Sequence, residues 1–321
     1  MRRGLIALAL ACALPATTSA QGLSFTPGAA PTGAYRFTAR WDTYAHGQTA
    51  TSGAAPAVSS TTITAWTNVL SAQLDLGAMV LRTALPLAYA RRATRTTVLG
   101  TSTESSDDQA ELGNVGLEGL ASIDLGSPEQ RLLIGGGIAL PTATDQRRDA
   151  FDVRGLLVRQ VAWRTSFRNA AAWAEQSFTL WPSIEYRYAG PWVLVSVQGS
   201  IPIFLPTHSD VGGPLARGMA EVMLALDVSG AVRIEDVVDV GASLMTWAMP
   251  SGAGYHPGGG SGTPDLGQVA ASIFVRTDDA LDLPVGGGAE MIFNLDNEWG
   301  PTGDDGKFWG FRIFVSGRFD G

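Results

Sequence analysis

The sequence predicts an all-β protein, an antiparallel up-and-down transmembrane β-barrel of twelve strands. The first reason is composition, because the 321 residues are 45% hydrophobic but only 16% charged, against about 25% charged in soluble domains. The second is the length and alternation of the apolar runs, and the third is an alternation of short and long connections between them. After the N-terminus no run of apolar residues is long enough for a spanning helix, so strands in a closed barrel would have to cross the membrane.

Residues 1–20 have the pattern of a secretory signal peptide. Arg2 and Arg3 precede an apolar stretch over residues 4–14, and small residues lead to a cleavage site near Ala20. The stretch is too short for a helix through a hydrocarbon core of roughly 30 Å. We therefore expect a short periplasmic segment over residues 21–34 and a barrel over 35–321 in the outer membrane of a Gram-negative bacterium, inserted by the barrel-assembly machinery.

The charge and the cysteine content restrict the possible partners. Removing two arginines with the signal changes the formal net charge from −8 to −10, which argues against nucleic acid as a partner. Cys12, the single cysteine, lies in the signal, so we expect no thiol, disulfide or cysteine metal site in the mature chain. The sequence implies no cofactor and does not indicate an oligomeric state.

The two terminal strands carry the clearest alternation. Residues 309–319 place aromatic and aliphatic side chains on one parity and mainly polar ones on the other, and residues 35–42 repeat the pattern. About ten tilted residues are enough to span, with aromatic girdles at both interfaces. The expected girdle residues are Tyr35, Trp41, Tyr186, Tyr188, Trp309 and Phe319.

Ten further strands are predicted between these two, each longer than the usual soluble strand of about 5 to 6 residues. They cover residues 61–73, 78–91, 110–124, 131–140, 176–188, 191–203, 216–231, 237–247, 265–277 and 283–295. The short turns fall at residues 74–77, 126–130, 189–190, 232–236 and 278–282. The long loops fall at 45–60, 92–109, 141–175, 204–215, 248–264 and 296–306. Outer-membrane barrels have short periplasmic turns and long outer loops, so this alternation favours a barrel over a sandwich.

The polar parity of these strands would face the lumen. The expected lumen-lining residues are Arg36, Arg40, Asp42, Arg82, Glu118, Glu185, Arg187, Glu221, Asp227, Asp239, Arg276, Glu290 and Arg312. A lumen of twelve strands is wider than one that side chains just fill and narrower than that of a sixteen-stranded porin. The charges could form a constriction that selects small solutes, or a salt-bridge network that only fills space.

The long loop over residues 141–175 concentrates positive charge in an acidic protein. Its arginines are the candidate residues of a constriction loop: Arg147, Arg148, Arg154, Arg159, Arg164 and Arg168. Loops of this length are usually functional or disordered. It could fold into the mouth of the barrel, lie against anionic lipopolysaccharide, or be solvated.

Catalytic and metal chemistry have little support in the sequence. His46, His208 and His256 all fall in predicted outer loops, without the spacing of metal ligands or of a nucleophile with its base. We expect no metal site and no enzyme. The glycine runs 135–137 and 286–288 lie in predicted strands, where they indicate bends or close approach, not phosphate loops.

Several phrases between residues 70 and 145 resemble a known family. They are Leu85-Pro86-Leu87, the run 111–117 (ELGNVGL) and the run 136–142 (GGIALPT). These are similar to the recurring pattern of outer-membrane transporters of the meta-pathway phenol-degradation type. The resemblance implies a twelve-stranded channel for small, often hydrophobic or aromatic molecules, and it supplies no catalytic residues.

The sequence thus favours a channel or porin for passive diffusion, with outer-membrane lipids and small solutes as partners. One alternative is an occluded structural or adhesion barrel that binds through its outer loops. A second is a lipid-modifying enzyme, whose activity would have to depend on Ser209 and the three histidines.

Overall fold

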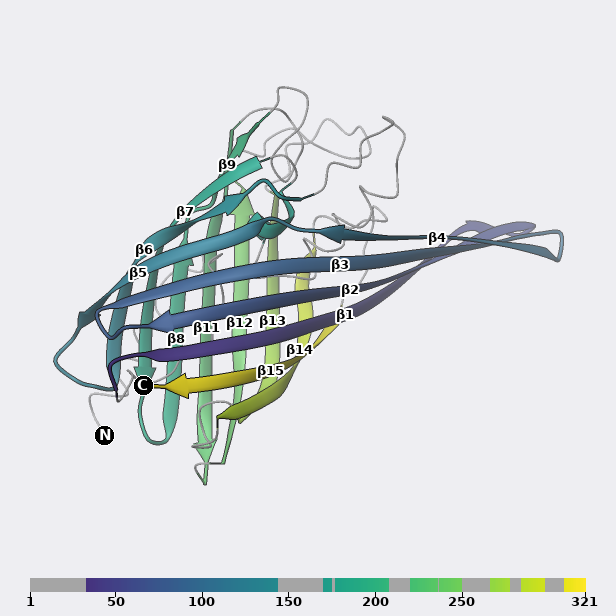
Figure 1. Cartoon of the computed structure of the whole chain (residues 1–321). Coiled ribbons are helices and arrows are strands. Elements are labelled where there is room, and N and C mark those ends of the chain that lie inside the picture. Colours follow the sequence, from purple (N-terminus) through teal and green to yellow (C-terminus); the bar gives the residue numbers. More distant parts are fainter. Residues whose placement is uncertain are drawn as a thin grey trace.

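The structure is a computed structural model, and it describes residues 33–143, 170–174, 177–207, 220–235, 237–249, 266–277, 284–297 and 309–321. Apart from the 3₁₀ helix η1 (Ala170–Trp173), all its elements are strands (Figure 1). Along the chain these are β1 (Arg36–Ala54), β2 (Ala57–Asp75), β3 (Met79–Val98), β4 (Thr101–Leu112), β5 (Val115–Asp124), β6 (Gln130–Leu140), β7 (Ser177–Ala189), β8 (Val193–Ser200), β9 (Ile203–Pro206), β10 (Glu221–Val222), β11 (Leu224–Ile234), β12 (Val238–Met249), β13 (Leu266–Arg276), β14 (Val285–Asn297) and β15 (Trp309–Asp320).

These segments form a closed antiparallel barrel of twelve strands, which confirms the predicted fold class. Three barrel strands are interrupted and carry two labels each, namely β4 with β5, β8 with β9, and β10 with β11. Sequence neighbours pair throughout, and the first and last strands pair to close the cylinder, with Arg36 opposite Asp320. Each barrel strand is therefore hydrogen-bonded to a neighbour on both sides, as a lipid environment requires.

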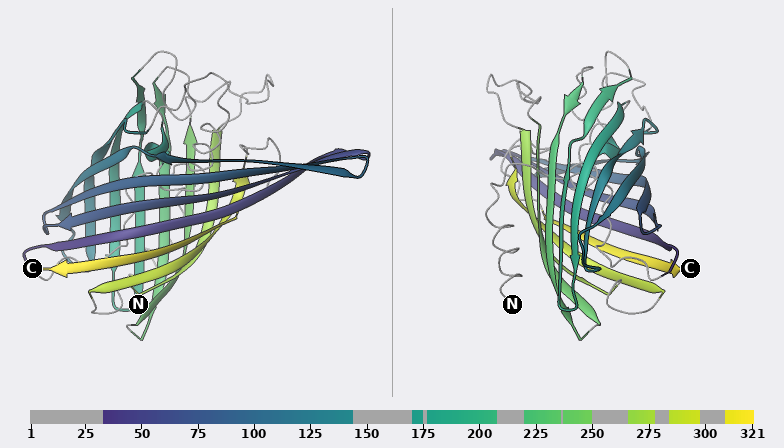
Figure 2. Two further views of the ribbon diagram at one scale, coloured as in Figure 1. Left: turned by 45° about the vertical axis from the view of Figure 1, so that its right-hand side comes forward. Right: turned by 90° about the vertical axis from the view of Figure 1, so that its left-hand side faces the viewer.

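Two of the predicted long loops are wrong, because residues 45–60 and 92–109 continue the strand ladders. β1 and β2 stay paired up to Ala54 opposite Ala57, and β3 and β4 stay paired up to Val98 opposite Thr101. Residues 92–109 include five threonines, β-branched residues that suit paired strands. Both hairpins extend together beyond one end of the barrel (Figures 1 and 2).

The described turns at the opposite end are short, as predicted for the periplasmic side, and the predicted turn 278–282 lies outside the described residues. Asp75 accepts a hydrogen bond from the backbone of Gly77 at 2.9 Å, and Asp124 accepts one from Gly126 at 2.8 Å. Each aspartate closes an Asx-type turn whose glycine has a positive φ, so these turns are specified locally. The connections of residues 250–265 and 298–308, on the other side, lie outside the described residues.

Apolar side chains cover the outside of the barrel wall. Trp41, Leu70, Ile273, Ile313 and Val315 are between 50% and 60% exposed. In a protein in water this would be a large unfavourable apolar surface, whereas in a bilayer it is the surface that contacts lipid. Within the described residues no helix is long and apolar enough to cross a membrane.

Candidate functional site

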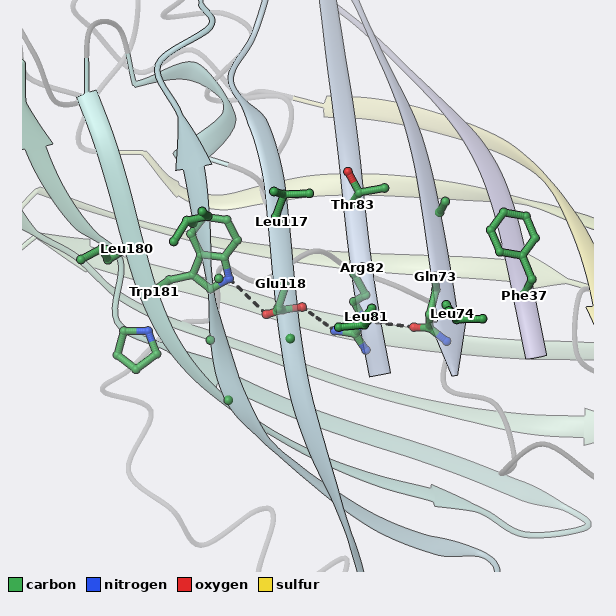
Figure 3. Close-up of a pocket in the computed structure, with 17 residues that line it drawn as sticks. Phe37, Gln73, Leu74, Leu81, Arg82, Thr83, Leu117, Glu118, Leu180 and Trp181 are labelled. Carbon is green, nitrogen blue, oxygen red and sulfur yellow. Dashed lines mark hydrogen bonds and ion pairs between the residues drawn. The ribbon is translucent and has the colours of Figure 1, made fainter. Parts of the chain in front are cut away.

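The inner wall on β2, β3, β5 and β7 carries a network of charges around Arg82. Its guanidinium donates to Gln73 at 3.0 Å, to Glu118 at 2.9 Å and to Glu185 at 2.8 Å. Glu185 also accepts from Arg187 at 2.6 Å. These bonds connect four strands on the lumen side of the wall. The side chains of Arg82 and Glu118 are fully buried. Figure 3 shows part of it, the links from Gln73 through Arg82 to Glu118.

A second network occupies the inner wall on β1 and β12 to β15. Asp42 accepts from Arg40 at 3.0 Å and from Arg312 at 2.7 Å, and Arg312 also donates to Glu290. The chain of bonds continues from Glu290 to Ser272 and on to a serine of β12. Arg40 lies 3.8 Å over the ring of Phe314, a close cation–π contact. Together the two networks cover most of the circumference with paired charges.

The periplasmic end of the lumen holds two further sets of ion pairs. Arg131 binds Asp75 through two nitrogens, at 2.6 and 3.1 Å, and donates to the carbonyl of Gly77 at 2.9 Å. On the opposite side Asp239 lies between Arg233 at 2.9 Å and Arg276 at 3.5 Å. The Arg131–Asp75 pair joins β6 to β2, which are not sequence neighbours, whereas Asp239 on β12 pairs with residues of the two neighbouring strands.

Buried apolar side chains gather in one part of the lumen, which we call the chamber. Its residues, all buried and on the inward parity, belong to one cluster: Tyr44, Ala65, Val69, Ala84, Ala88, Ala90, Ala139, Trp181, Phe204, Met223, Ala225, Met245, Trp247, Ala270 and Ile292, with Ala171, Trp173 and Ala174 from η1 and the residue after it. The chamber adjoins the charged networks, because Tyr44 lies opposite Arg312 and the Trp181 indole donates to Glu118 at 3.1 Å.

Asn114 fixes η1 inside this chamber. Its side-chain amide donates to the carbonyls of Ala171 at 3.1 Å and Ala174 at 2.6 Å, and its side-chain oxygen accepts from the backbone of Ala143 at 2.8 Å. A side chain on neighbouring Gly113 would collide with the carbonyl of Ala172 and with Trp173. The interruption between β4 and β5 is therefore the socket that receives the end of the long connection.

Glycines on the inward parity make room for inward aromatic rings. A Cβ on Gly137 would overlap the indole of Trp181, and a Cβ on Gly288 would lie 2.6 Å from the ring of Phe314. This confirms that the glycine runs of β6 and β14 mark close approach. It also explains how large rings fit on a parity otherwise occupied by charges.

The residues expected to line the lumen have inward positions. Twelve of the thirteen are buried: Arg40, Asp42, Arg82, Glu118, Glu185, Arg187, Glu221, Asp227, Asp239, Arg276, Glu290 and Arg312. Arg36 is half-buried at the periplasmic rim, where it donates to Asp320 at 2.6 Å. Eleven of the thirteen take part in the ion pairs and hydrogen bonds described above: Arg36, Arg40, Asp42, Arg82, Glu118, Glu185, Arg187, Asp239, Arg276, Glu290 and Arg312.

Sequence reasoning missed several members of the interior. Asp75 and Arg131 lie at strand ends next to predicted turns, and their pairing crosses β3 and β5, which no local pattern indicates. Tyr44, Trp181 and Trp247 point inward at positions where their strands otherwise carry polar side chains. An aromatic residue among the polar positions of a strand could have indicated that the lumen contains aromatic rings.

Most of the loop residues fall outside the described residues. These are the six arginines Arg147, Arg148, Arg154, Arg159, Arg164 and Arg168, together with His208, Ser209 and His256. His46 is described by its backbone, which pairs with Gly310 in β15.

The expected girdle residues differ in exposure. Trp41 and Phe319 are 60% and 61% exposed, and Tyr35 is 44% exposed. Tyr186 and Tyr188 are half-buried, and the side chain of Trp309 lies outside the described residues. Trp66 and Tyr89 face each other on the outer wall of β2 and β3 and were not anticipated as girdle residues.

The outer wall also has an apolar hollow of about 790 Å³ over β1 to β7 (Figure 3). Phe37, Leu81 and Leu117 belong to its lining and are exposed outward residues, so it opens toward lipid. Gly119 and Gly136 contribute no side chain to it. Its lining also includes Gln73, Arg82, Glu118 and Trp181, which belong to the inner wall, so the hollow lies directly beside the Arg82 network.

An apolar outside, a charged inside and full closure define a transmembrane β-barrel of the outer-membrane type. Among solved structures, the chain is similar to an outer-membrane channel from Pseudomonas putida F1, with 12% identity and a TM-score of 0.57, over 92% of this chain and all of that one. It also matches the NanC porin at 7% identity and a TM-score of 0.45, over 86% and 98% of the two chains. No family model and no curated protein sequence matches it. At these identities the likeness concerns the fold.

Proposed function

We propose that this protein is an outer-membrane channel for the passive diffusion of small solutes, with apolar or aromatic molecules favoured. The observation that carries the proposal is the mixed interior of a twelve-stranded barrel, in which a chamber of apolar and aromatic side chains adjoins networks of paired charges. A barrel that served only as an anchor would not need this width, because eight strands suffice for side chains to fill the inside.

The two kinds of inward side chain suggest how a solute would pass. An apolar solute would enter the aromatic chamber, where Phe204, Met223 and Trp247 replace part of its contact with water. It would also meet the charged networks around Arg82 and Arg312, which select by charge and by hydrogen bonding. Since these inward side chains are buried, passage requires some of them to rotate.

The described end of the long connection supports a role for this loop. Asn114 holds Ala171 and Ala174 at the chamber. We infer that this connection is the steric gate of the channel. The main alternative is an occluded structural or adhesion barrel, which the dense ion-pair networks would also fit.

Single-channel recording in planar lipid bilayers tests the proposal. We expect the mature protein to open in steps, and deletion of residues 147–168 to increase the conductance severalfold. The control is deletion of residues 95–104 at the end of the β3–β4 hairpin, which lies away from the chamber and should leave the conductance unchanged. No openings in the intact protein and none in the 147–168 deletion would favour the occluded barrel.

A further inference from the structure

The hollow on the outer wall is a furrow that runs across the strands from β1 to β7. Its floor is one row of outward residues, each the Cα partner of the next: Phe37, Leu74, Leu81, Gly119, Gly136 and Pro182. All of them belong to the lining of the hollow (Figure 3). Gly119 and Gly136 have no side chain, so the backbone of β5 and β6 is the floor in the middle of the furrow.

Larger side chains follow the furrow along both sides. The next outward row toward the barrel mouth also belongs to the lining and consists of Thr83, Leu117, Ile138 and Leu180. The next outward row toward the periplasm consists of Met79, Ala121, Ile134 and Ile184. A narrow apolar slot between two such rows suits one flexible, unbranched hydrocarbon chain, which gains dispersion contacts on both of its sides.

The length and inclination of the furrow match one leaflet of the membrane. The row crosses β1, β2, β3, β5, β6 and β7, so it spans five inter-strand spacings, or roughly 24 Å at about 4.8 Å each. Since barrel strands tilt by about 35–45° from the axis, a row perpendicular to them is inclined by about 45–55°. The furrow therefore rises roughly 15 Å along the membrane normal, which is half of a hydrocarbon core of about 30 Å.

This rise lies in the periplasmic half of the barrel. Phe37 follows Arg36, the first residue of β1, at the periplasmic rim. Pro182, at the other end of the row, lies in the middle of β7 (Ser177–Ala189). In an outer membrane the periplasmic leaflet consists of glycerophospholipids, and lipopolysaccharide occupies the opposite leaflet. A hydrocarbon chain that reaches the furrow therefore belongs to a glycerophospholipid.

The charges beside the furrow do not oppose an apolar occupant. Arg82 and Glu118 are part of the lining, but their side chains are fully buried and pair with each other at 2.9 Å on the lumen side. On the inner face of β6 the indole of Trp181 lies against Gly137. The glycine run of β6 is thus covered by an aromatic ring inside, and the furrow leaves its outer side to the lipid.

We propose that the furrow binds one acyl chain of a glycerophospholipid of the periplasmic leaflet, and that this chain covers the glycine backbone of β5 and β6. The site is continuous with the lipid-facing wall of the barrel. It goes beyond the proposed channel function, because a barrel that conducts nothing would bind the same chain.

Photo-cross-linking of the full mature protein in phospholipid vesicles tests the site. The probe is a phosphatidylethanolamine that carries a diazirine in the middle of one acyl chain, and mass spectrometry of peptides locates the label. We expect the outward positions of β5 to β7 to carry at least threefold more label than the exposed outer wall of β13 to β15, which includes Ile273, Met291 and Ile313. Equal labelling of the two walls would overturn the proposal without the need for any variant.

Gly119→Leu fills the furrow with a side chain. A Cβ at this position would meet Leu81 at 3.7 Å, an ordinary contact, so the wall can accept the change. Labelling of β5 to β7 should fall to the level of β13 to β15. The matched control is Gly230→Leu, at an outward glycine of β11 that is not part of the lining and whose Cβ would lie 4.0 Å from the carbonyl of Leu194. This control should be labelled as the parent is.

Heat-modifiable gel migration checks that both variants are folded. Unchanged labelling in folded Gly119→Leu, or an equal loss in Gly230→Leu, would overturn the site. Lipid A with the same diazirine in an acyl chain separates the two leaflets, and stronger labelling of the furrow by lipid A would contradict the assignment to phospholipid. A second copy of the barrel in the furrow would exclude lipid, so weaker labelling there than on β13 to β15, together with dimers on native gels, would also reject the proposal.

Discussion

At the scale of single residues, the interior depends on a few side chains that have several partners each. Asn114 makes three side-chain hydrogen bonds that join the barrel wall to Ala143 and to the segment containing η1. Arg82 donates to three different strands. The loss of such a residue leaves several buried polar groups without a hydrogen bond. The resulting fall in the free energy of unfolding is larger than the contribution of one average hydrogen bond.

Asn114→Ala should release η1 from its socket. Three lost hydrogen bonds correspond to a fall of about 2–3 kcal/mol in the free energy of unfolding. Urea unfolding in lipid vesicles measures this loss, and limited proteolysis should show faster cleavage near residues 170–174. The matched control is Asn68→Ala, an asparagine that bonds to Trp41 and Thr43 on the outer wall. If both variants resist protease equally, Asn114 does not anchor the segment.

Gly137→Val should disturb the barrel through Trp181. A side chain at position 137 would overlap the indole ring, which is itself bonded to Glu118 at 3.1 Å. Overpacking of this kind costs about 1–3 kcal/mol, measurable as a lower urea midpoint. Gly119→Val is the control, because a Cβ there would meet Leu81 at 3.7 Å, an ordinary contact. A similar midpoint for both variants would contradict the close packing described.

At the scale of elements, the β3–β4 hairpin has a pattern of charges in its sequence that indicates paired strands, although this segment was predicted to be a loop. Arg91, Arg92 and Arg95 stand opposite Asp108, Asp107 and Glu104. These charges are mirrored about a turn at Leu99 and Gly100, both of which have the positive φ of a two-residue hairpin turn. The mirror was visible in the sequence, but the polar composition suggested a loop. Opposite charges that face each other across two strands stabilise the hairpin. The charge pattern was therefore a better predictor of structure here than the polar composition.

Charge reversal tests this hairpin. Arg95→Glu should place two glutamates opposite each other and loosen the end of the hairpin, at a cost of about 0.2–1 kcal/mol. Hydrogen exchange of the backbone amides over residues 92–104 should become faster. Adding Glu104→Arg restores an opposite pair and should restore the slow exchange. If the double variant exchanges as fast as the single one, the cross-strand charges do not stabilise the hairpin.

Other elements could not have been predicted from local pattern. η1 is four residues long, and only its contact with Asn114 and the apolar chamber gives it a position. The breaks between β8 and β9 and between β10 and β11 fall within single predicted strands. Short pieces of this kind depend on tertiary contacts, which a period of two cannot indicate. The long alternating strands, whose pattern extends over ten or more residues, were by contrast correctly predicted.

At the scale of the whole molecule, closure of the barrel connects the two ends of the chain. β1 pairs with β15 over eleven residues, from Arg36 opposite Asp320 to His46 opposite Gly310. The number of strands was predictable because each strand has its own alternation. The networks inside were not, because a bond such as Arg82 to Glu185 depends on the shear of the whole cylinder.

Cross-linking tests the closure directly. Ala39→Cys with Gly317→Cys joins directly opposed positions on β1 and β15, so an oxidant should form a disulfide in the folded protein. Because the loop so closed includes nearly the whole barrel, unfolding should become harder by about 3–5 kcal/mol. Ala39→Cys with Ala289→Cys, on strands that are not neighbours, is the control. Equal cross-linking of both pairs would reject the register.

The hairpins of β1 to β4 also determine what the cell presents to its surroundings. β1 and β2 are 19 residues long, while about 9–11 residues suffice to cross the bilayer. At about 3.3 Å per residue, the remainder reaches on the order of 25–30 Å further along the strands. An antibody or a bacteriophage approaching the cell would therefore meet an ordered, charged ribbon before it reached the barrel mouth, and an epitope inserted at Leu99-Gly100 would be displayed at its end.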